Sequence, residues 1–371
     1  MPQPDRPAWL EVDLSAIETN ISSVCNFVSP PTQVLAVIKA NAYGHGSIPV
    51  AKAALKGGAS ALGVALLQEG IELRQSGIKA PIVILSPSLP DFAKDIVAHN
   101  LSQTISDPAI LDALEIAAKH HKTQAPVHLK IDTGMSRVGI LPNEILPLAQ
   151  RISDSPHLFF EGIATHIAWE RAQDIHLADA QLERFSDCVS KLSSIPIKWR
   201  HAANSVMTVH HPNAHFDLVR VGLLTYGIPP AQGTGHLSLT PALSLKARLT
   251  QIQNFRAGQT LSYGGTYTLK RASRIGLIPL GYADGYSRRL SNKAHALVCG
   301  QPCPVVGAIC MDLTLIDITD IPQAQPGEEV ILLGNKNGHQ ITVADLAQWA
   351  DSIPHETVSQ LSSRLPRSYI S

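Results

Sequence analysis

The first group that could do covalent chemistry is a lysine placed directly after an apolar run. Residues 34–38 (VLAVI) have the composition of a buried strand, and Lys39 follows them without a break. Taken alone, such a lysine is more simply explained as a side chain that reaches from a strand end to water. An amine held away from water, however, can form a Schiff base with a carbonyl compound. Lys39 is therefore a candidate nucleophile that needs further evidence.

Other polar groups follow apolar runs in the same manner. They lie at residues 130–137, 165–166, 201–205 and 220–223. Any one of these segments could be an ordinary solvated loop. If the apolar runs are parallel strands of one barrel, however, the segments meet at its C-terminal rim, where barrel enzymes carry their active sites. Ser205 and Gly222 would then suit a phosphate, through a hydroxyl group and a closely approaching backbone N–H.

The elements that would position these groups alternate between strand and helix patterns. Eight β-branched runs are strand candidates: residues 34–38, 61–65, 82–85, 101–104, 127–131, 158–164, 197–201 and 218–221. Between them, apolar residues recur at three- and four-residue spacing, as in helices, at residues 49–56, 68–76, 90–99, 108–121, 143–152 and 181–192. Eight such units predict a parallel (β/α)8 barrel. An open doubly wound sheet is the alternative.

The pattern changes after Pro229. Strand-like runs at residues 244–252, 275–278, 296–299, 313–316 and 330–333 are separated by turn signals rich in glycine and proline. We therefore expect an α/β chain of two domains, with the barrel at residues 1–232 and a mainly β domain at residues 233–371. A short N-terminal strand near residues 8–12 could join the second domain.

Composition narrows the class of partner. The 371 residues include 30 Lys and Arg and 30 Asp and Glu, so no net field would attract nucleic acid or an anionic membrane. The start of the chain lacks the apolar core of a secretory signal, and no apolar run approaches the length of a membrane helix. Five cysteines, odd in number and mostly in apolar runs, suit reduced thiols in the cytoplasm. We expect a cytoplasmic protein with a small-molecule partner.

Two groups of residues could in principle hold a metal ion. Cys299, Cys303 and Cys310 lack paired spacing, and His210, His211 and His215 fit a polar loop at least as well. The sequence therefore predicts no metal site.

The residues around Lys39 resemble a known signature. Residues 37–46 (VIKANAYGHG) are similar to the cofactor-lysine segment of alanine racemases. The resemblance continues in the family's order through most of the chain, in DTGM (132–135), AANS (202–205), PALSL (241–245), SYG (262–264), GYADG (281–285), CMD (310–312) and RLPR (364–367). One motif would be weak evidence, but so many in register are strong evidence.

The resemblance implies pyridoxal 5′-phosphate as the cofactor, carried on Lys39. It implies that Arg220 faces the pyridine nitrogen, that His166 backs Arg220, and that Asn204 shapes the phosphate loop. The phosphate would be held by Tyr43, Ser205, His355 and the N–H groups of Gly222 and Leu223. Lys130 matches a position that is often carbamylated in the family, where it orients Arg137.

The implied reaction interconverts L-alanine and D-alanine, which would supply D-alanine for the bacterial cell wall. It needs one base on each face of the α-carbon. Lys39 would serve one face, and Tyr263, reaching over from the partner subunit of a homodimer, would serve the other. Arg137 and the backbone N–H of Met311 would bind the substrate carboxylate.

Arg220 bears on the type of reaction. A guanidinium group does not give its proton to a pyridine nitrogen, so the cofactor would be a weaker electron sink. A short-lived carbanion favours prompt reprotonation, as in a racemase, over transamination.

One position departs from the family. His355 stands where alanine racemases usually have a tyrosine that narrows the substrate pocket, so a broader alanine and serine racemase is an alternative. Two other classes share parts of the pattern: a non-catalytic pyridoxal-phosphate-binding barrel, which would not need the second domain, and a decarboxylase of basic amino acids, whose cysteine-bearing motif is not evident.

Overall fold

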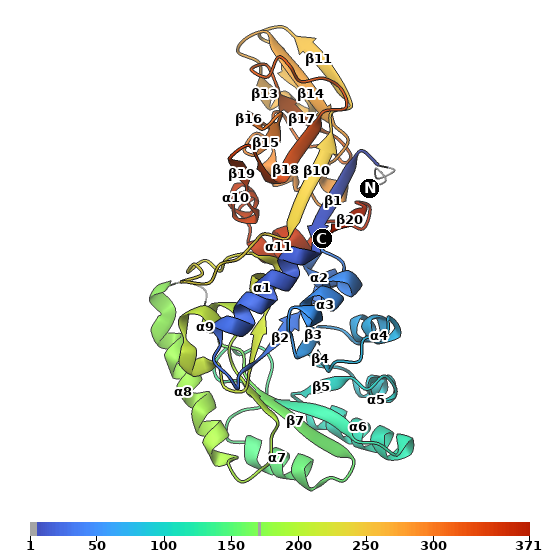
Figure 1. The fold of residues 1–371 in the computed structure, drawn as a ribbon, viewed down its shortest axis with the longest axis vertical. Helices are drawn as coiled ribbons and strands as arrows, with labels where there is room; N and C mark the ends of the chain where they lie inside the picture. Colours follow the sequence, from blue (N-terminus) through green and yellow to red (C-terminus); the bar gives the residue numbers. More distant parts are fainter. Residues whose placement is uncertain (1–5, 170–171) are drawn as a thin grey trace. The chain divides into compact units, whose positions relative to one another are not determined.

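The computed structural model describes residues 6–169 and 172–371, which form two compact units (Figure 1). One unit contains residues 15–42 and 47–240. The other contains three segments: the residues before residue 15, residues 43–46, and the chain from Pro241 onward. The chain therefore passes between the units more than once. After the barrel, the second of these units resumes at Pro241.

The first unit is an eight-stranded parallel barrel with helices between its strands (Figure 1). The strands are β2 (Gln33–Val37), β3 (Ala61–Val64), β4 (Ile82–Ile84), β5 (Ser102–Ile105), β6 (Ala125–Lys130), β7 (Leu158–Ala164), β8 (Trp199–His201) and β9 (Leu218–Val221). They pair in chain order from β2 to β8, and β9 pairs with β2. Two backbone hydrogen bonds join β9 to β8. The Asp217 N–H donates to the Arg200 oxygen at 3.0 Å, and the Arg220 N–H donates to the Ala203 oxygen at 2.9 Å. The predicted (β/α)8 barrel is confirmed, and the open sheet is wrong.

Most helices of this unit overlap the stretches that the apolar spacing predicted, but the first and the last of them were not predicted. The helices are α1 (Leu14–Phe27), α3 (Ser47–Lys56), α4 (Leu67–Gln75), α5 (Ala93–Ala98), α6 (Pro108–His121), α7 (Ile145–Asp154), α8 (Ile175–Lys191) and α9 (Ser205–His210). Helix α6 shows the signals that bound a predicted helix. The Asp107 side chain accepts from the N–H of Ala109 at 2.8 Å, Pro108 occupies the first turn, and Lys122 ends the helix in a left-handed conformation.

The barrel interior carries a polar set as well as an apolar core. Gln103, His128, Glu161, His201 and Arg220 are all buried. Side-chain hydrogen bonds join β6 to β8 and β5 to β7, which are not neighbouring strands, so these bonds cross the interior. Most buried polar groups are hydrogen-bonded. His128, Glu161, His201 and Arg220 bond to one another in series, and Gln103 bonds to Ser88 and to backbone oxygens.

The second unit is mainly β. Its largest sheet contains β16 (Gln301–Pro304), β15 (His295–Val298), β18 (Glu329–Lys336), β10 (Leu243–Arg248), β1 (Ala8–Asp13) and β20 (Arg367–Ile370) in that order, with β19 (His339–Ile341) on β18. Strands β11 (Gln251–Phe255), β14 (Ser273–Ile278) and β17 (Thr314–Asp317) form a second sheet, and β12 (Thr260–Leu261) pairs with β13 (Tyr267–Thr268). The N-terminal strand β1 pairs with β10 and β20 in this unit.

Two predictions for this unit need correction. Residues 244–252 were expected to form one strand, but β10 and β11 belong to different sheets. The change of partner falls between two residues: the Leu249 N–H donates to the Glu328 oxygen, and the Thr250 N–H donates to the Leu277 oxygen. The unit also has two short helices that the strand patterns did not reveal, α10 (Val343–Trp349) and α11 (Pro354–Ser359).

Candidate active site

Lys39 begins a turn of unusual backbone geometry. Ala40, Asn41, Ala42 and Tyr43 all have φ of 52–53°, in the left-handed region. A non-glycine residue there costs about 1–2 kcal/mol, so successive residues remain there only when other contacts hold them. The Asn41 side chain supplies one such contact by accepting from the Ser47 N–H at 2.9 Å. The turn therefore fixes the backbone at the amine-bearing residue.

Glu69, at the start of α4, holds the same turn from a neighbouring element. Its carboxylate accepts from the backbone N–H groups of Ala40 at 2.6 Å, Ala65 at 2.8 Å and Leu66 at 3.0 Å. It thus ties the segments after β2 and β3 together. Glu69 is not among the predicted site residues, although a glutamate at the third helical position is a helix-start signal.

Four cations surround His166, which follows β7. Burial is the main cause that holds the pKa of His166 well below its usual range, and the charges of Lys130, Arg220, Arg137 and Lys39 add to it. Burial and Arg137 likewise lower the pKa of Lys39, while Glu69 opposes them. The structure therefore brings five of the predicted site residues to one rim of the barrel, and that rim suits an anion.

Lys130 and Arg137 lie at either end of the loop after β6. Burial, then Arg220 and Arg137, hold the pKa of Lys130 well below its usual range. The Asp132 carboxylate fixes the loop by accepting from the N–H groups of Gly134, Ser136 and Arg137 at 2.9–3.0 Å. The Arg137 side chain is exposed and so remains open to an external ligand.

Arg220, on β9, is buried and held by four acceptors. Its two terminal nitrogens donate to Nδ1 of His201 at 2.9 Å and to the backbone oxygens of His201, Thr165 and Ala202 at 2.8–3.1 Å. The imidazole that accepts from Arg220 is that of His201, whereas His166, the residue expected to back Arg220, lies close enough for the charge of Arg220 to lower its pKa. No described residue accepts from the fifth N–H, on Nε. Burial lowers the pKa of Arg220 to about 10, so it stays charged at neutral pH.

The segments after β8 and β9 meet as predicted. The Ser205 hydroxyl accepts from the Gly222 N–H at 3.0 Å. Asn204 caps α9 by accepting from the Met207 N–H at 3.1 Å and donates to the Ile167 oxygen at 3.1 Å, so it shapes this loop. Leu223 begins a 3-10 turn directly after Gly222. A hydroxyl group and a helical turn that begins beside it form a plausible place for a phosphate.

The remaining predicted residues belong to the second unit. The rings of Tyr43 and His355 lie 6.0 Å apart at 44°. Arg367, in the predicted RLPR motif, donates to the Gly44 oxygen at 3.0 and 3.1 Å. A Cβ atom at Gly44 would overlap the backbone oxygen of Val358. The glycine of the signature is therefore needed for close contact with the C-terminal segment.

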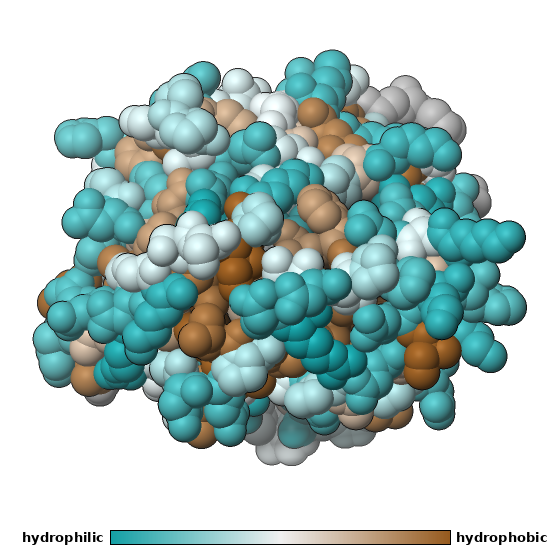
Figure 2. Space-filling view, turned by 90° about the horizontal axis from the view of Figure 1, so that it is seen from below, coloured by the Kyte–Doolittle hydropathy of each residue, from teal (hydrophilic) through white to brown (hydrophobic). Residues whose placement is uncertain are grey.

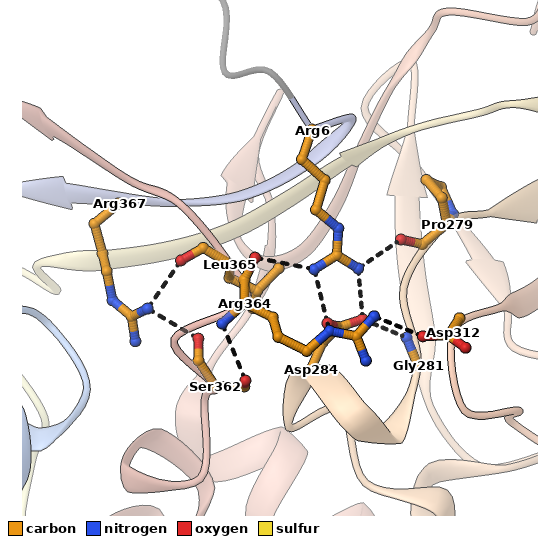
Figure 3. A network of polar contacts seen from close by, with 9 residues as sticks. All are labelled: Arg6, Pro279, Gly281, Asp284, Asp312, Ser362, Arg364, Leu365 and Arg367. Atoms are coloured by element: carbon orange, nitrogen blue, oxygen red, sulfur yellow. Dashed lines mark hydrogen bonds and ion pairs between the residues drawn. The ribbon is translucent and has the colours of Figure 1, made fainter.

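Met311 is 53% exposed in a loop held from two sides. The N–H groups of Tyr282 and Ala283 donate to the oxygens of Cys310 and Met311, each at 3.0 Å. On the other side, Arg364 donates to Asp312 at 2.6 Å, within the ion-pair network of Figure 3. In the part of the chain that the structure describes, nothing accepts from the Met311 N–H, which leaves this donor available.

Tyr263 is the most exposed large apolar residue of the described chain, at 74%. It begins a 3-10 turn after Ser262, whose φ is 59° and whose hydroxyl donates to the Ala308 oxygen at 2.6 Å. A rigidly held, projecting tyrosine would suit a group that acts outside its own unit.

The next findings concern metal binding, cysteine pairing and membrane-spanning helices among the residues that the structure describes. Across residues 6–169 and 172–371, no group of three or more His, Cys, Asp or Glu side chains could hold a metal ion. All five cysteines are free. None of the helices in these ranges has the length and apolar character needed to cross a membrane. The face shown in Figure 2 carries mostly hydrophilic side chains, interrupted by small hydrophobic patches.

The barrel with a reactive lysine among cations at its rim, together with an added β unit, defines an enzyme that acts on a small anionic molecule. Comparison with known proteins gives the family. Residues 12–230 match the alanine racemase N-terminal domain, and residues 242–369 match the alanine racemase C-terminal domain. The chain belongs to the alanine racemase family.

Relatives and solved structures agree over almost the whole length. The chain is 41% identical to an alanine racemase of Symbiobacterium thermophilum, over 98% of this chain and 97% of that protein. It is 39% identical to one from a Nostoc species, over 97% and 95%. The crystal structure of alanine racemase from Streptomyces lavendulae superposes with a TM-score of 0.94 at 32% identity, covering 100% of this chain and 98% of that one. An alanine racemase from Bacillus anthracis, solved with bound L-Ala-P, gives a TM-score of 0.92 at 32% identity, covering 100% and 96%.

Proposed function

We propose that this protein is a pyridoxal-phosphate-dependent racemase that interconverts L-alanine and D-alanine and so supplies D-alanine for the bacterial cell wall. The observation that carries the proposal is the position of Lys39. Its amine has a lowered pKa and lies at a rim where three further cations surround His166. A matching second unit argues against the alternative of a single-barrel, non-catalytic protein.

The residues at this rim fit the cofactor. An amine whose pKa is lowered is more often neutral, and only the neutral form attacks an aldehyde. The cations suit the negative charge of a substrate carboxylate, and the free Nε–H of Arg220 suits a ring nitrogen that is an acceptor. When bound, pyridoxal phosphate stabilises negative charge at the substrate α-carbon, and the protein supplies orientation and proton transfer.

The phosphate would be held by Ser205 and the N–H groups of Gly222 and Leu223 on the barrel, and Asn204 keeps their loop in shape. Tyr43 and His355, whose rings pack together, would also contribute donors to the phosphate.

Two bases would act on opposite faces of the α-carbon. Lys39 is the first. Tyr263 is the second, supplied by the partner subunit of a homodimer, and its 74% exposure supports a role outside its own unit. The substrate carboxylate would meet Arg137 and the Met311 N–H, both of which are open to a ligand.

Lys130 would be carbamylated. Its lowered pKa favours the neutral amine that reacts with carbon dioxide, and burial near Arg220 and Arg137 makes an anion more favourable there than a cation. The modified side chain would then orient Arg137. Mass spectrometry of the intact protein at neutral pH tests this by the added mass of one carbon dioxide.

A chiral assay tests the proposed function. L-alanine alone and D-alanine alone should both converge on an equal mixture without release of gas. Borohydride should fix the cofactor to a peptide that contains Lys39. Lys39→Ala should abolish both results, and Lys52→Ala, which changes an exposed lysine on α3, should leave both intact. Labelling of another lysine, or gas release in place of racemisation, would contradict the proposal.

A further inference from the structure

A row of buried side chains runs from Arg220 into the barrel interior. Nδ1 of His201 accepts from Arg220 at 2.9 Å, and Nε2 of His201 lies 2.8 Å from Nδ1 of His128. Nε2 of His128 lies 3.1 Å from Oε2 of Glu161. Three strands supply the interior members, β8, β6 and β7. The row is a continuous hydrogen-bonded relay, not a set of separate contacts.

Glu161 is the anionic end of this relay. Its carboxylate also accepts from Ser102 and, at 3.2 Å, from Lys198, whose side chain is 42% exposed. Burial acts to raise the pKa of this carboxylate, but the hydrogen bonds from His128 and Ser102 and the charge of Lys198 outweigh burial and lower the pKa. Glu161 is therefore ionised and can only accept hydrogen bonds.

The two ends dictate where each proton lies. Arginine can only donate, so Nδ1 of His201 must be the acceptor. Burial, aided by Arg220, holds the pKa of His201 well below its usual range, so the ring is neutral and its single proton is on Nε2. That N–H donates to Nδ1 of His128, and the proton of His128 on Nε2 then donates to Glu161. Every proton position in the relay is thus determined by a fixed donor at one end and a fixed acceptor at the other.

We propose that Glu161 and His128 are positioning residues that act through His201 on Arg220. A carboxylate that accepts from an imidazole makes the other ring nitrogen a stronger acceptor, as it does for histidine ligands of metals. Two imidazoles in series pass this effect to Nδ1 of His201, which strengthens its hold on the guanidinium group. The relay fixes the plane and charge of Arg220 from within the barrel.

The functional consequence rests on the proposed function, because it requires Arg220 to face the cofactor ring. If the guanidinium group of Arg220 is firmly held, its free Nε–H stays directed at the pyridine nitrogen of the cofactor. Water then cannot take the position of Arg220 and protonate that nitrogen. Loosening the relay would then alter the electronic state of the bound cofactor without any change in a group that touches it.

Nitrogen NMR of histidine-labelled protein tests the relay independently of catalysis. The ring signals of His128 and His201 should show both as neutral, with the proton on Nε2. Glu161→Gln keeps the shape but removes the charge, so the Nε2 proton of His128 should move upfield and the signals of His201 should shift with it. Ser102→Ala removes a competing donor to the same oxygen, so the His128 proton should move in the opposite direction.

Glu115→Gln is the matched control, because Glu115 also accepts from a serine and a cation, Ser155 and Arg151, but no histidine ring of the described residues donates a hydrogen bond to it. It should move neither ring. A cationic ring, a proton on Nδ1 of His201, or unchanged His201 signals in folded Glu161→Gln would overturn the relay. If Glu161→Gln does not fold, the opposite-sign shift in Ser102→Ala decides: its presence supports the relay and its absence overturns it.

The visible absorption of the purified holoenzyme tests the last step. The cofactor band should shift in Glu161→Gln but not in Glu115→Gln, and an unshifted band would overturn the claim that the relay reaches the cofactor. Absence of racemisation by the unaltered protein, with the histidine protons placed as described, would refute the proposed function and leave the relay standing.

Discussion

Both carboxylate oxygens of Asp284 accept hydrogen bonds from Arg6, each at 2.7 Å, while the Asp284 side chain has no exposed surface (Figure 3). Arg6 precedes β1, and Asp284 follows β14 in the GYADG segment. The same carboxylate accepts from the Gly281 N–H at 3.1 Å, and Arg364 lies 3.4 Å from it. The pair therefore anchors the start of the described chain to the loop that supports Met311.

Loss of Arg6 should cost much stability. Arg6→Met leaves a buried carboxylate without its main partner, and we expect a loss of about 3 kcal/mol in the free energy of unfolding, the lower end of the usual range because Arg364 remains. Arg271→Met is the matched control, because its partner Asp320 is exposed, and its effect on the free energy of unfolding should be much smaller. Urea unfolding measures both, and equal losses would contradict the assigned role.

Asp284 should make stability depend on pH at the acid end. Burial alone would raise its pKa, but hydrogen bonds from Arg6 and Gly281 outweigh burial and lower it. The folded-state pKa is thus below the unfolded value of about 3.9, so the stabilisation is complete above that value and is lost as pH falls through the folded pKa. The stability difference between the protein and Asp284→Asn should therefore shrink between pH 5 and pH 2. A difference that grows on acidification would refute the assignment.

Two glycines of the VIKANAYGHG signature should differ in tolerance to alanine. At Gly44 a Cβ atom would meet a backbone oxygen, whereas at Gly46 it would meet the hydroxyl end of the Tyr369 side chain. Gly77→Ala is the control for backbone strain alone, since Gly77 also has positive φ but an added Cβ would touch nothing within 4 Å. We expect a loss of about 1–2 kcal/mol for Gly77→Ala and larger losses for the other two.

Tyr369→Phe distinguishes the two signature glycines. It removes the atom that Gly46→Ala would strike, so the double variant should recover part of the lost stability, and the same change should not help Gly44→Ala. Thermal unfolding of the single and double variants gives the coupling. No recovery for Gly46→Ala would mean that the clash lies elsewhere.

Tyr263 should work in the partner's site. Lys39→Ala and Tyr263→Phe should each be nearly inactive as pure proteins. When the two are mixed under conditions of subunit exchange, a heterodimer assembles one intact site and one site lacking both bases, so up to about a quarter of the unaltered activity should return at complete random exchange. Verified exchange without recovery would show that both bases come from the same subunit.

His355 should broaden the substrate range. Imidazole is smaller than phenol, which leaves more room beside the substrate methyl group and a hydrogen-bonding partner for a hydroxyl. His355→Tyr should therefore lower the ratio of kcat/KM for serine to that for alanine, by about tenfold, at the lower end of what one extra group contributes in an apolar pocket. Equal ratios in the two proteins would show that neighbouring side chains refill the space.

The barrel was predictable because each strand is short, apolar and bounded by clear signals. Strands β7 and β9 have the predicted bounds, and the others differ by one to two residues at an end. The α10 helix was missed because its seven residues are too few for a periodic pattern, although Thr342 and Asp345 form a capping pair that marks its start.

The site was predictable residue by residue but not in its contacts. The left-handed turn after Lys39 could not be foreseen, because Ala40 and Ala42 carry no local signal for positive φ. The hydrogen bond from Arg220 to His201 could not be predicted, because His201 ends β8 and His166 follows β7, and only the direction of each side chain decides which imidazole accepts from Arg220. Glu161 lies within an apolar strand and looks like an isolated charge until the fold places it beside His128.

The pairing of β1 has a consequence for the order of folding during synthesis. Leu10 is hydrogen-bonded in register between Leu245 on β10 and Arg367 on β20, so both neighbours of this strand leave the ribosome long after it does. The barrel strands, by contrast, mostly pair with the next strand made. We infer that the barrel can assemble while the chain is still growing, whereas β1 has no partner strand until β10 has been made and keeps one unpaired edge until β20 follows.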